Sequence, residues 1–140
     1  MARRGPLPAG QVLRGTVARV PSPPKHLTKA ARDFWRKYAS EIASEGRLTT
    51  ADLGPFERLS VAWGTLVDLD SILQRDGLVI TSTTGVQKQH PAAAVRAAAE
   101  KTFLALAAAF GLTPAARLRT PAIPEEPDSK TRDVERQYFG

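Results

Sequence analysis

The chain has 140 residues, with 20 Lys and Arg against 14 Asp and Glu, two His, no Cys and a formal net charge of +6. This length suits one domain, and the lack of Cys excludes disulfide-built scaffolds, thiolate nucleophiles and Cys-based zinc or iron–sulfur sites. No window approaches the roughly 18 consecutive apolar residues of a membrane span, and the start lacks the apolar stretch of a secretory signal, so we expect a soluble, intracellular protein.

The positive charge is concentrated at one end of the chain. Residues 1–38 contain nine basic residues and one acidic residue, whereas residues 39–140 contain 11 basic and 13 acidic residues. A segment with this excess can collect phosphate groups without disturbing a core, so nucleic acid is the first partner to consider. The alternative is a basic surface that serves solubility only.

Composition divides the chain into three parts. Residues 1–24 contain five Pro, three Gly and four Arg, which predicts a flexible basic arm that does not propagate a helix. Residues 25–119 are predicted to form a helical core and oligomerisation domain. Residues 120–140, with three Pro and eight charged residues, are predicted to be a flexible, disordered C-terminal tail.

The first helix is expected to begin after Thr28, its N-cap, and to run to about Glu45, where Gly46 supplies a left-handed residue. At 3.6 residues per turn it has one apolar face and one charged face. The apolar face contains Ala31, Phe34, Trp35, Tyr38 and Ile42, and the charged face contains Lys29, Arg32, Asp33, Arg36 and Lys37. The pattern predicts a helix that packs on one side and meets solvent or phosphate on the other.

The second helix is expected to begin at Thr49 or Thr50 and to end at Asp76, before Gly77. Its apolar residues exceed what one partner helix covers, which indicates packing on two sides, within the chain or against a neighbouring subunit. The predicted oligomerisation residues are Phe56, Leu59, Trp63, Leu66 and Leu73. The angular positions of Trp35 and Trp63 favour core packing over a binding role.

Residues 78–89 predict a short β-hairpin, because β-branched residues surround a Thr84-Gly85 turn. A third helix is expected to open at His90-Pro91 and to run to about Phe110. Its packing face is predicted to contain Val95, Ala99, Thr102, Leu106 and Phe110. A short fourth helix is expected from Thr113-Pro114 to Arg119, so the fold class is mainly α, with three to four helices.

The parts of most enzyme sites are missing from the sequence. It has no phosphate-binding Gly loop and no His pair at metal-ligand spacing, so we expect no cofactor, no metal and no catalytic residue. His26 reads as part of the basic arm, and His90 as a structural residue before a helix. Asp68 and Asp70 are two residues apart on a helix and point in different directions. A solvated helix face therefore explains them better than a carboxylate pair for acid–base catalysis or metal binding.

The basic residues of the arm and of the first helix are the predicted DNA contacts. They are Arg3, Arg4, Arg14, Arg19, Lys25, Lys29, Arg32, Arg36 and Lys37. Because no aromatic residue interleaves with them on the surface, duplex DNA held by its phosphates fits better than a stacked single strand.

The order of motifs resembles that of a phage terminase small subunit over about residues 24–119. The shared features are Pro23-Pro24-Lys25-His26-Leu27, Phe34-Trp35, Gly46-Arg47-Leu48-Thr49 with Asp52, Trp63, Asp76-Gly77-Leu78, the Gly85 turn, Gln89-His90-Pro91, and the run from Phe110 to Arg117. In particular, a His-Pro helix start followed about twenty residues later by Phe-Gly-Leu-Thr-Pro is a specific arrangement.

The resemblance implies a non-enzymatic, ring-forming homo-oligomer in the host cytoplasm. Such a protein binds double-stranded viral DNA at the packaging initiation site, and recruits and regulates the large terminase subunit, which supplies the ATPase and nuclease. By analogy, Tyr138 and Phe139 in the tail are the predicted docking residues for that subunit. No membrane and no small-molecule substrate is expected. The alternatives are a dimeric DNA-binding transcriptional regulator, a nucleoid-associated protein, or a scaffold with protein partners only.

Overall fold

The computed structural model describes residue 17 and residues 19–119. Its elements, in chain order, are α1 (Lys29–Ser44), the 3-10 turn η1 (Thr50–Asp52), α2 (Leu53–Asp76), β1 (Val79–Thr81), β2 (Gln87–Gln89), α3 (Pro91–Ala109) and α4 (Pro114–Arg119). The mainly helical fold with one small hairpin is therefore confirmed. Most of the predicted arm and all of the predicted tail lie outside the described residues.

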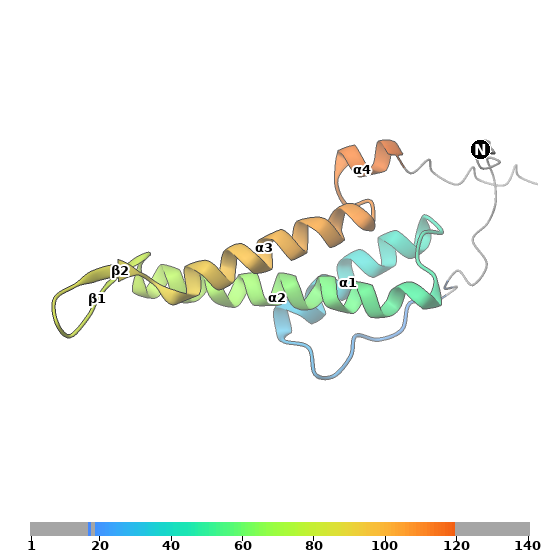
Figure 1. The fold of residues 1–140 in the computed structure, drawn as a ribbon. Helices are drawn as coiled ribbons and strands as arrows, with labels where there is room; N and C mark the ends of the chain where they lie inside the picture. Colours follow the sequence, from blue (N-terminus) through green and yellow to red (C-terminus); the bar gives the residue numbers. More distant parts are fainter. Residues whose placement is uncertain (1–16, 18, 120–140) are drawn as a thin grey trace, which may run out of the picture.

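A long antiparallel pair of helices, α2 and α3, forms the axis of the molecule (Figure 1). The strands β1 and β2 pair antiparallel and extend from one end of this pair. At the other end, α1 packs beside α2, and α4 follows the end of α3. We call the end that carries α1 the proximal end, and the end that carries the hairpin the distal end.

Local sequence signals set the helix boundaries where they are expected. The Thr28 hydroxyl accepts a hydrogen bond from the Ala31 amide at 3.4 Å and caps α1. The chain leaves α1 through Gly46 (φ 68°) and leaves α2 through Gly77 (φ 80°), both in the region that disfavours a side chain. His90 caps α3, since its Nδ1 accepts a hydrogen bond from the Ala92 amide at 3.0 Å. These boundaries confirm the predicted first and third helices.

The second helix begins with a tighter turn than predicted. Residues Thr50–Asp52 form a 3-10 turn, closed by hydrogen bonds from the Thr49 amide and hydroxyl to the Asp52 carboxylate at 2.9 and 2.7 Å. Pro55 is the third residue of α2, where its missing N–H removes no helical hydrogen bond. The prediction of a helix from Thr49 or Thr50 to Asp76 is confirmed apart from this first turn.

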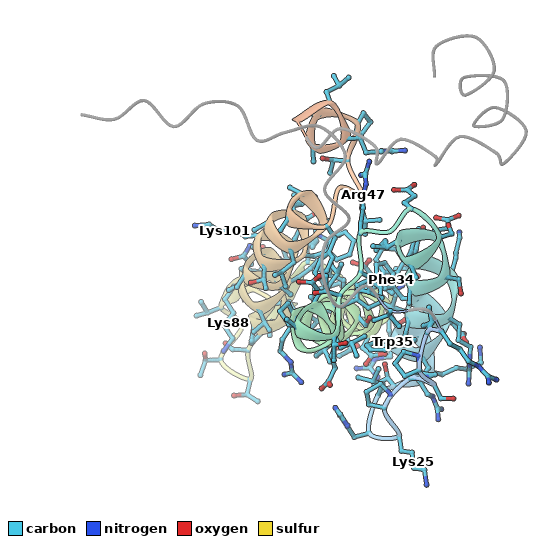
Figure 2. All side chains as sticks on the ribbon, turned by 90° about the vertical axis from the view of Figure 1, so that its right-hand side faces the viewer. Lys25, Phe34, Trp35, Arg47, Lys88 and Lys101 are labelled. Atoms are coloured by element: carbon cyan, nitrogen blue, oxygen red, sulfur yellow. The ribbon has the colours of Figure 1, made fainter. Side chains whose placement is uncertain are left out.

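The core lies at the proximal end and is built around Phe56, which is fully buried. Its ring meets Trp35 of α1 at 5.1 Å and Phe110, the residue that ends α3, at 5.4 Å between centroids. Figure 2 shows Phe34 between the helices, and its ring lies 5.9 Å from that of Phe103. These contacts are in the range of favourable aromatic pairs.

The predicted packing face of α3 was wrong in part. Val95 and Thr102 are exposed, whereas Ala107 is buried and Phe103 packs against the core. The physical reason is that the large Phe103 ring enters between Phe34 and Trp63, which turns the helix away from the predicted phase. Trp35 is buried as predicted, but Trp63 keeps 39% of its surface exposed although its ring contacts Phe34 and Phe103.

Polar side chains link the helices at the distal end. The Arg96 guanidinium of α3 donates to the Asp70 carboxylate of α2, and this contact raises the pKa of Arg96. Nearer the hairpin, His90 Nε2 lies 3.0 Å from Asp76 Oδ2. Asp70 is thus half-buried and ion-paired, which corrects its assignment to a solvated face.

Candidate nucleic-acid interface

The outward side of α1 carries four cations on its first two and a half turns. We call Lys29, Arg32, Arg36 and Lys37 the α1 basic face. The apolar residues Ala31, Phe34 and Trp35 of the same helix are buried, so packing against α2 fixes which side faces solvent. The structure therefore presents these four predicted DNA contacts together on one helix.

Asp33 is the one acid within the α1 basic face. Its carboxylate accepts a hydrogen bond from Lys29 Nζ at 2.9 Å and lies 3.5 Å from Arg36 Nη1. The hydrogen bond from Lys29, opposed by partial burial and helped by the charges of Lys29, Arg36 and Arg32, lowers the pKa of Asp33. The carboxylate is therefore ionised at neutral pH and leaves the face with an excess of positive charge.

The basic character ends within α1. Glu41 and Glu45, both exposed, follow the four cations toward the end of the helix. Lys37 Nζ lies 5.1 Å from the centroid of the Tyr38 ring, a cation–π contact that keeps the ammonium at the surface. Lys29 and Arg36 are paired with Asp33, whereas no carboxylate among the described residues forms an ion pair with the half-buried Arg32 or the exposed Lys37.

Two hydrogen bonds hold the segment before α1 against the core. The Trp35 indole Nε1 donates to the Pro21 carbonyl at 3.0 Å, and the Val17 amide donates to the Leu48 carbonyl at 2.8 Å. Arg19 and Lys25 are exposed on this attached segment. Arg3, Arg4 and Arg14 lie outside the described residues.

Arg58 is a cation of this region that sequence reasoning missed. With His26 and Thr28 it lines a pocket of about 210 Å³ next to the start of α1. Its Nη2 lies 2.8 Å from Glu57 Oε1, which also contacts His26 Nε2 at 2.9 Å, and these hydrogen bonds, that of Arg58 first, lower the pKa of Glu57. No sequence signal identified it, because Arg58 comes from α2 and only tertiary packing brings it beside α1.

The predicted oligomerisation residues fall into two groups. Phe56, Leu59 and Leu66 are buried inside the single chain, so their side chains offer no surface to a second copy. Trp63 and Leu73 keep part of their surface exposed. The apolar excess of α2 is explained first by its position between α1 and α3.

A family model described as "Phage terminase, small subunit" matches residues 31–127, more than two thirds of the chain. The chain belongs to this family. Membership gives the small terminase a role in phage DNA packaging, and implies DNA and the large terminase subunit as partners. No curated protein and no solved structure matches the chain.

The match covers α1 beyond its first two residues and continues through α4, so the basic helix and the helical pair both belong to the family region. The predicted docking residues of the small terminase, Tyr138 and Phe139, lie outside the described residues. No helix among the described residues is both long and apolar enough to cross a membrane. Nor do those residues contain a cluster of three or more His, Cys, Asp or Glu side chains that could hold a metal ion.

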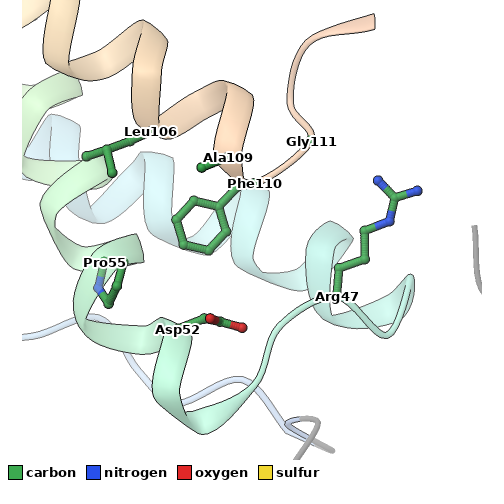
Figure 3. Close-up of a pocket in the computed structure, with 7 residues that line it drawn as sticks. All are labelled: Arg47, Asp52, Pro55, Leu106, Ala109, Phe110 and Gly111. Carbon is green, nitrogen blue, oxygen red and sulfur yellow. The ribbon is translucent and has the colours of Figure 1, made fainter. Parts of the chain in front are cut away.

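A pocket of the small terminase, about 310 Å³ in volume, lies between η1 and the end of α3 (Figure 3). Its walls are mainly apolar, with Pro55, Leu106 and Phe110 among them. Arg47 lies at one edge, and its Nε is 3.2 Å from Glu45 Oε2. Asp52 is already held in the Thr49 capping interaction. Residues from the loop before α2 and from the end of α3 therefore line the same pocket.

Proposed function

We propose that this small terminase binds double-stranded viral DNA at the packaging initiation site through its basic N-terminal segment and α1 basic face. The observation that carries the proposal is the fixed, outward placement of Lys29, Arg32, Arg36 and Lys37 on a helix whose other side is core. Because phosphates are the targets, the binding is electrostatic and weakens steeply with added salt. The protein itself has no catalytic site in this proposal, and ATPase and nuclease activity belong to the large subunit.

Ring assembly is the second part of the proposal. Beyond α1, the distal halves of α2 and α3 pack only against each other among the described helices, and the apolar side chains Val67, Leu69, Ile72 and Leu73 of α2 stay partly exposed. Two helices cannot enclose such a surface, so neighbouring copies cover it. Repetition around a ring multiplies a weak DNA affinity per copy through avidity.

The DNA contact is tested with the triple substitution of Arg32, Arg36 and Lys37 by Ala in the full-length protein. Each lost phosphate contact reduces the slope of log K against log salt by roughly 0.9, so three contacts reduce it by roughly 2.7. The measurement is a fluorescence-anisotropy titration of a duplex over a range of salt concentrations. Wild-type affinity and slope in this variant at low salt would refute the assignment.

A matched control separates this effect from a general loss of charge. Lys101 is exposed on α3, on the side of the bundle away from α1 (Figure 2). Lys101→Ala is expected to leave the salt slope unchanged. An equal loss in both variants would mean that net charge, and not the α1 basic face, drives binding.

Assembly is tested by the native mass at low and high salt. A discrete species well above a tetramer that survives high salt would show apolar ring contacts, whereas a monomer or dimer at every salt concentration would contradict the ring. Val95→Asp is expected to lower the mass, because Val95 is 54% exposed on the distal half of α3. Leu104 is equally exposed on the proximal half, so Leu104→Asp is the control.

Docking of the large subunit is proposed on Tyr138 and Phe139. The support is their aromatic character at the end of a charged segment, a residue type that dominates binding energy at interfaces. Replacing both by Ala is expected to abolish co-purification with the large subunit while leaving the native mass and the DNA affinity unchanged. Unchanged co-purification would move the docking surface to the helical core.

A further inference from the structure

The β-hairpin at the distal end has two different faces. In the pairing of β1 with β2, Val79 lies opposite Gln89 and Thr81 opposite Gln87, while Ile80 lies opposite Lys88. Side chains alternate across a strand and directly opposed residues share a side. Val79, Thr81, Gln87 and Gln89 therefore form one side, which we call the outer hairpin face.

The outer hairpin face is open to a ligand. All four of its residues are exposed, whereas Ile80 on the other face is half-buried. The hairpin extends beyond the ends of α2 and α3 (Figure 1), so the described helices do not cover it. Two isolated three-residue strands bury little apolar surface, and a packing role within the chain does not explain the four outward side chains.

The hairpin itself carries no negative charge. Between Asp76 and Glu100 the sequence has no acidic residue, Lys88 of β2 is basic, and Arg96 is paired with Asp70 and Glu100. The positive excess is small, so phosphate attraction alone does not hold this segment on DNA. A role that depends on hydrogen bonds and methyl contacts fits the composition better than bulk electrostatics.

We propose that the outer hairpin face reads base edges of duplex DNA, as a two-stranded ribbon placed in the major groove. That groove admits such a ribbon, Gln side chains make paired hydrogen bonds to adenine, and the methyl groups of Thr and Val contact the thymine methyl. This inference rests on the DNA binding proposed above, and adds to it the source of sequence preference, with A·T steps as the target.

The phosphate-binding face and the hairpin lie at different places along α2. The start of α1 lies beside Gly64, in the middle of α2, and the 12 residues from there to the hairpin end of α2 extend about 18 Å at 1.5 Å per residue. The hairpin lies beyond that end (Figure 1). Phosphate contacts on α1 position the protein, and base contacts at the hairpin specify the site.

The test is a binding selection from a random-sequence duplex library, made with the full-length wild-type protein and with the double variant Gln87→Ala, Gln89→Ala. Wild type is expected to enrich a motif that contains A·T steps. The double variant is expected to lose about 5- to 100-fold in preference for that motif over a scrambled duplex, while its affinity for the scrambled duplex stays the same. Thr81→Ser, which removes only a methyl group, is expected to weaken selection at a thymine.

Val86→Ala is the matched control, because Val86 is 60% exposed in the same hairpin but lies on the opposite face by alternation from Gln87. It is expected to keep the wild-type motif and preference. Circular dichroism checks that each variant keeps the helical content of the wild type.

The remaining outcomes separate the two proposals. If wild type binds DNA with no preferred motif, or if the Gln variant keeps the wild-type preference, base reading by the hairpin is wrong and phosphate binding stands. If the Gln variant changes the native mass but not the DNA preference, the hairpin is a contact between copies and the inference fails. If wild type binds no duplex at low salt, the proposed DNA binding itself fails.

Discussion

At the proximal end of the small terminase, three helices enclose Phe56 and Leu59 with no exposure, whereas at the distal end α2 and α3 pack only against each other among the described helices and are linked by polar pairs. The same two helices are thus a core element at one end and an extension at the other. The buried residues of the proximal end therefore contribute most of the free energy of unfolding, whereas the partly exposed apolar side chains of the distal end are available for contact with other molecules.

The largest expected effect comes from the proximal core. Phe56→Ala is expected to lower the free energy of unfolding by about 3–5 kcal/mol, because the ring contacts Trp35 and Phe110 and a cavity remains. The measurement is urea unfolding at one fixed protein concentration. Leu104→Ala, at a half-exposed position, is the control and is expected to change stability by no more than about 0.5–1 kcal/mol. Similar losses in both variants would remove the distinction between core and surface.

The close approach of α1 to α2 is tested at Gly64. A Cβ there would lie 2.6 Å from the Thr28 hydroxyl and 3.0 Å from the Ala31 Cβ, so Gly64→Ala is expected to cost about 1–3 kcal/mol despite the better helix propensity of Ala. Gly54, also in α2, has open space, and Gly54→Ala is expected to stabilise the protein by up to about 1 kcal/mol. Thermal unfolding of both variants gives the comparison, and stabilisation by both would contradict the close contact.

The distal ion pair between Asp70 and Arg96 is expected to contribute less. Both side chains are partly exposed, so a double-mutant cycle with Asp70→Asn and Arg96→Gln is expected to give a coupling of about 0.2–1 kcal/mol. The coupling is expected to fall with added salt, as it does for exposed pairs. A coupling of several kcal/mol would mean that the distal end is as tightly organised as the core.

The smallest effect is expected at the base of the hairpin. Hydrogen bonds from Arg75 first, and then from His90, lower the pKa of Asp76 from 3.8 to about 2. Because the folded pKa lies below the unfolded one, the stabilisation is present above pH 3.8 and is lost as the pH falls toward 2. The difference in thermal midpoint between wild type and Asp76→Asn is therefore expected to shrink over this interval. A difference that grows on acidification would contradict the sign.

Boundaries and caps of the helices were predictable because they depend on neighbours in sequence. Thr28, Gly46 and His90-Pro91 act within a turn of their own positions, and the structure confirms them. The packing face of α3 was not predictable, because its Ala-rich sequence gives little contrast between faces. There the insertion of Phe103 beside Phe34 decided the rotation of the helix.

For the candidate site, the sequence identified the cations of α1 but not their surroundings. Periodicity placed Lys29, Arg32, Arg36 and Lys37 together, since they are close in the chain. It did not find Arg58, which reaches the same region from another helix, nor the attachment of the preceding segment through Trp35 and Pro21. Both depend on contacts between residues far apart in sequence.

By itself the sequence determined the helices, the turn of the hairpin and the concentration of positive charge, because these follow from local propensity and from counting. Only the tertiary structure decided which apolar residues of α2 are used up in the core. The sequence pattern did not distinguish the residues that are buried within the chain, Phe56, Leu59 and Leu66, from those that stay partly exposed, Trp63 and Leu73. Periodicity shows that a face is apolar, but the length of α1 sets how much of that face is covered within the chain.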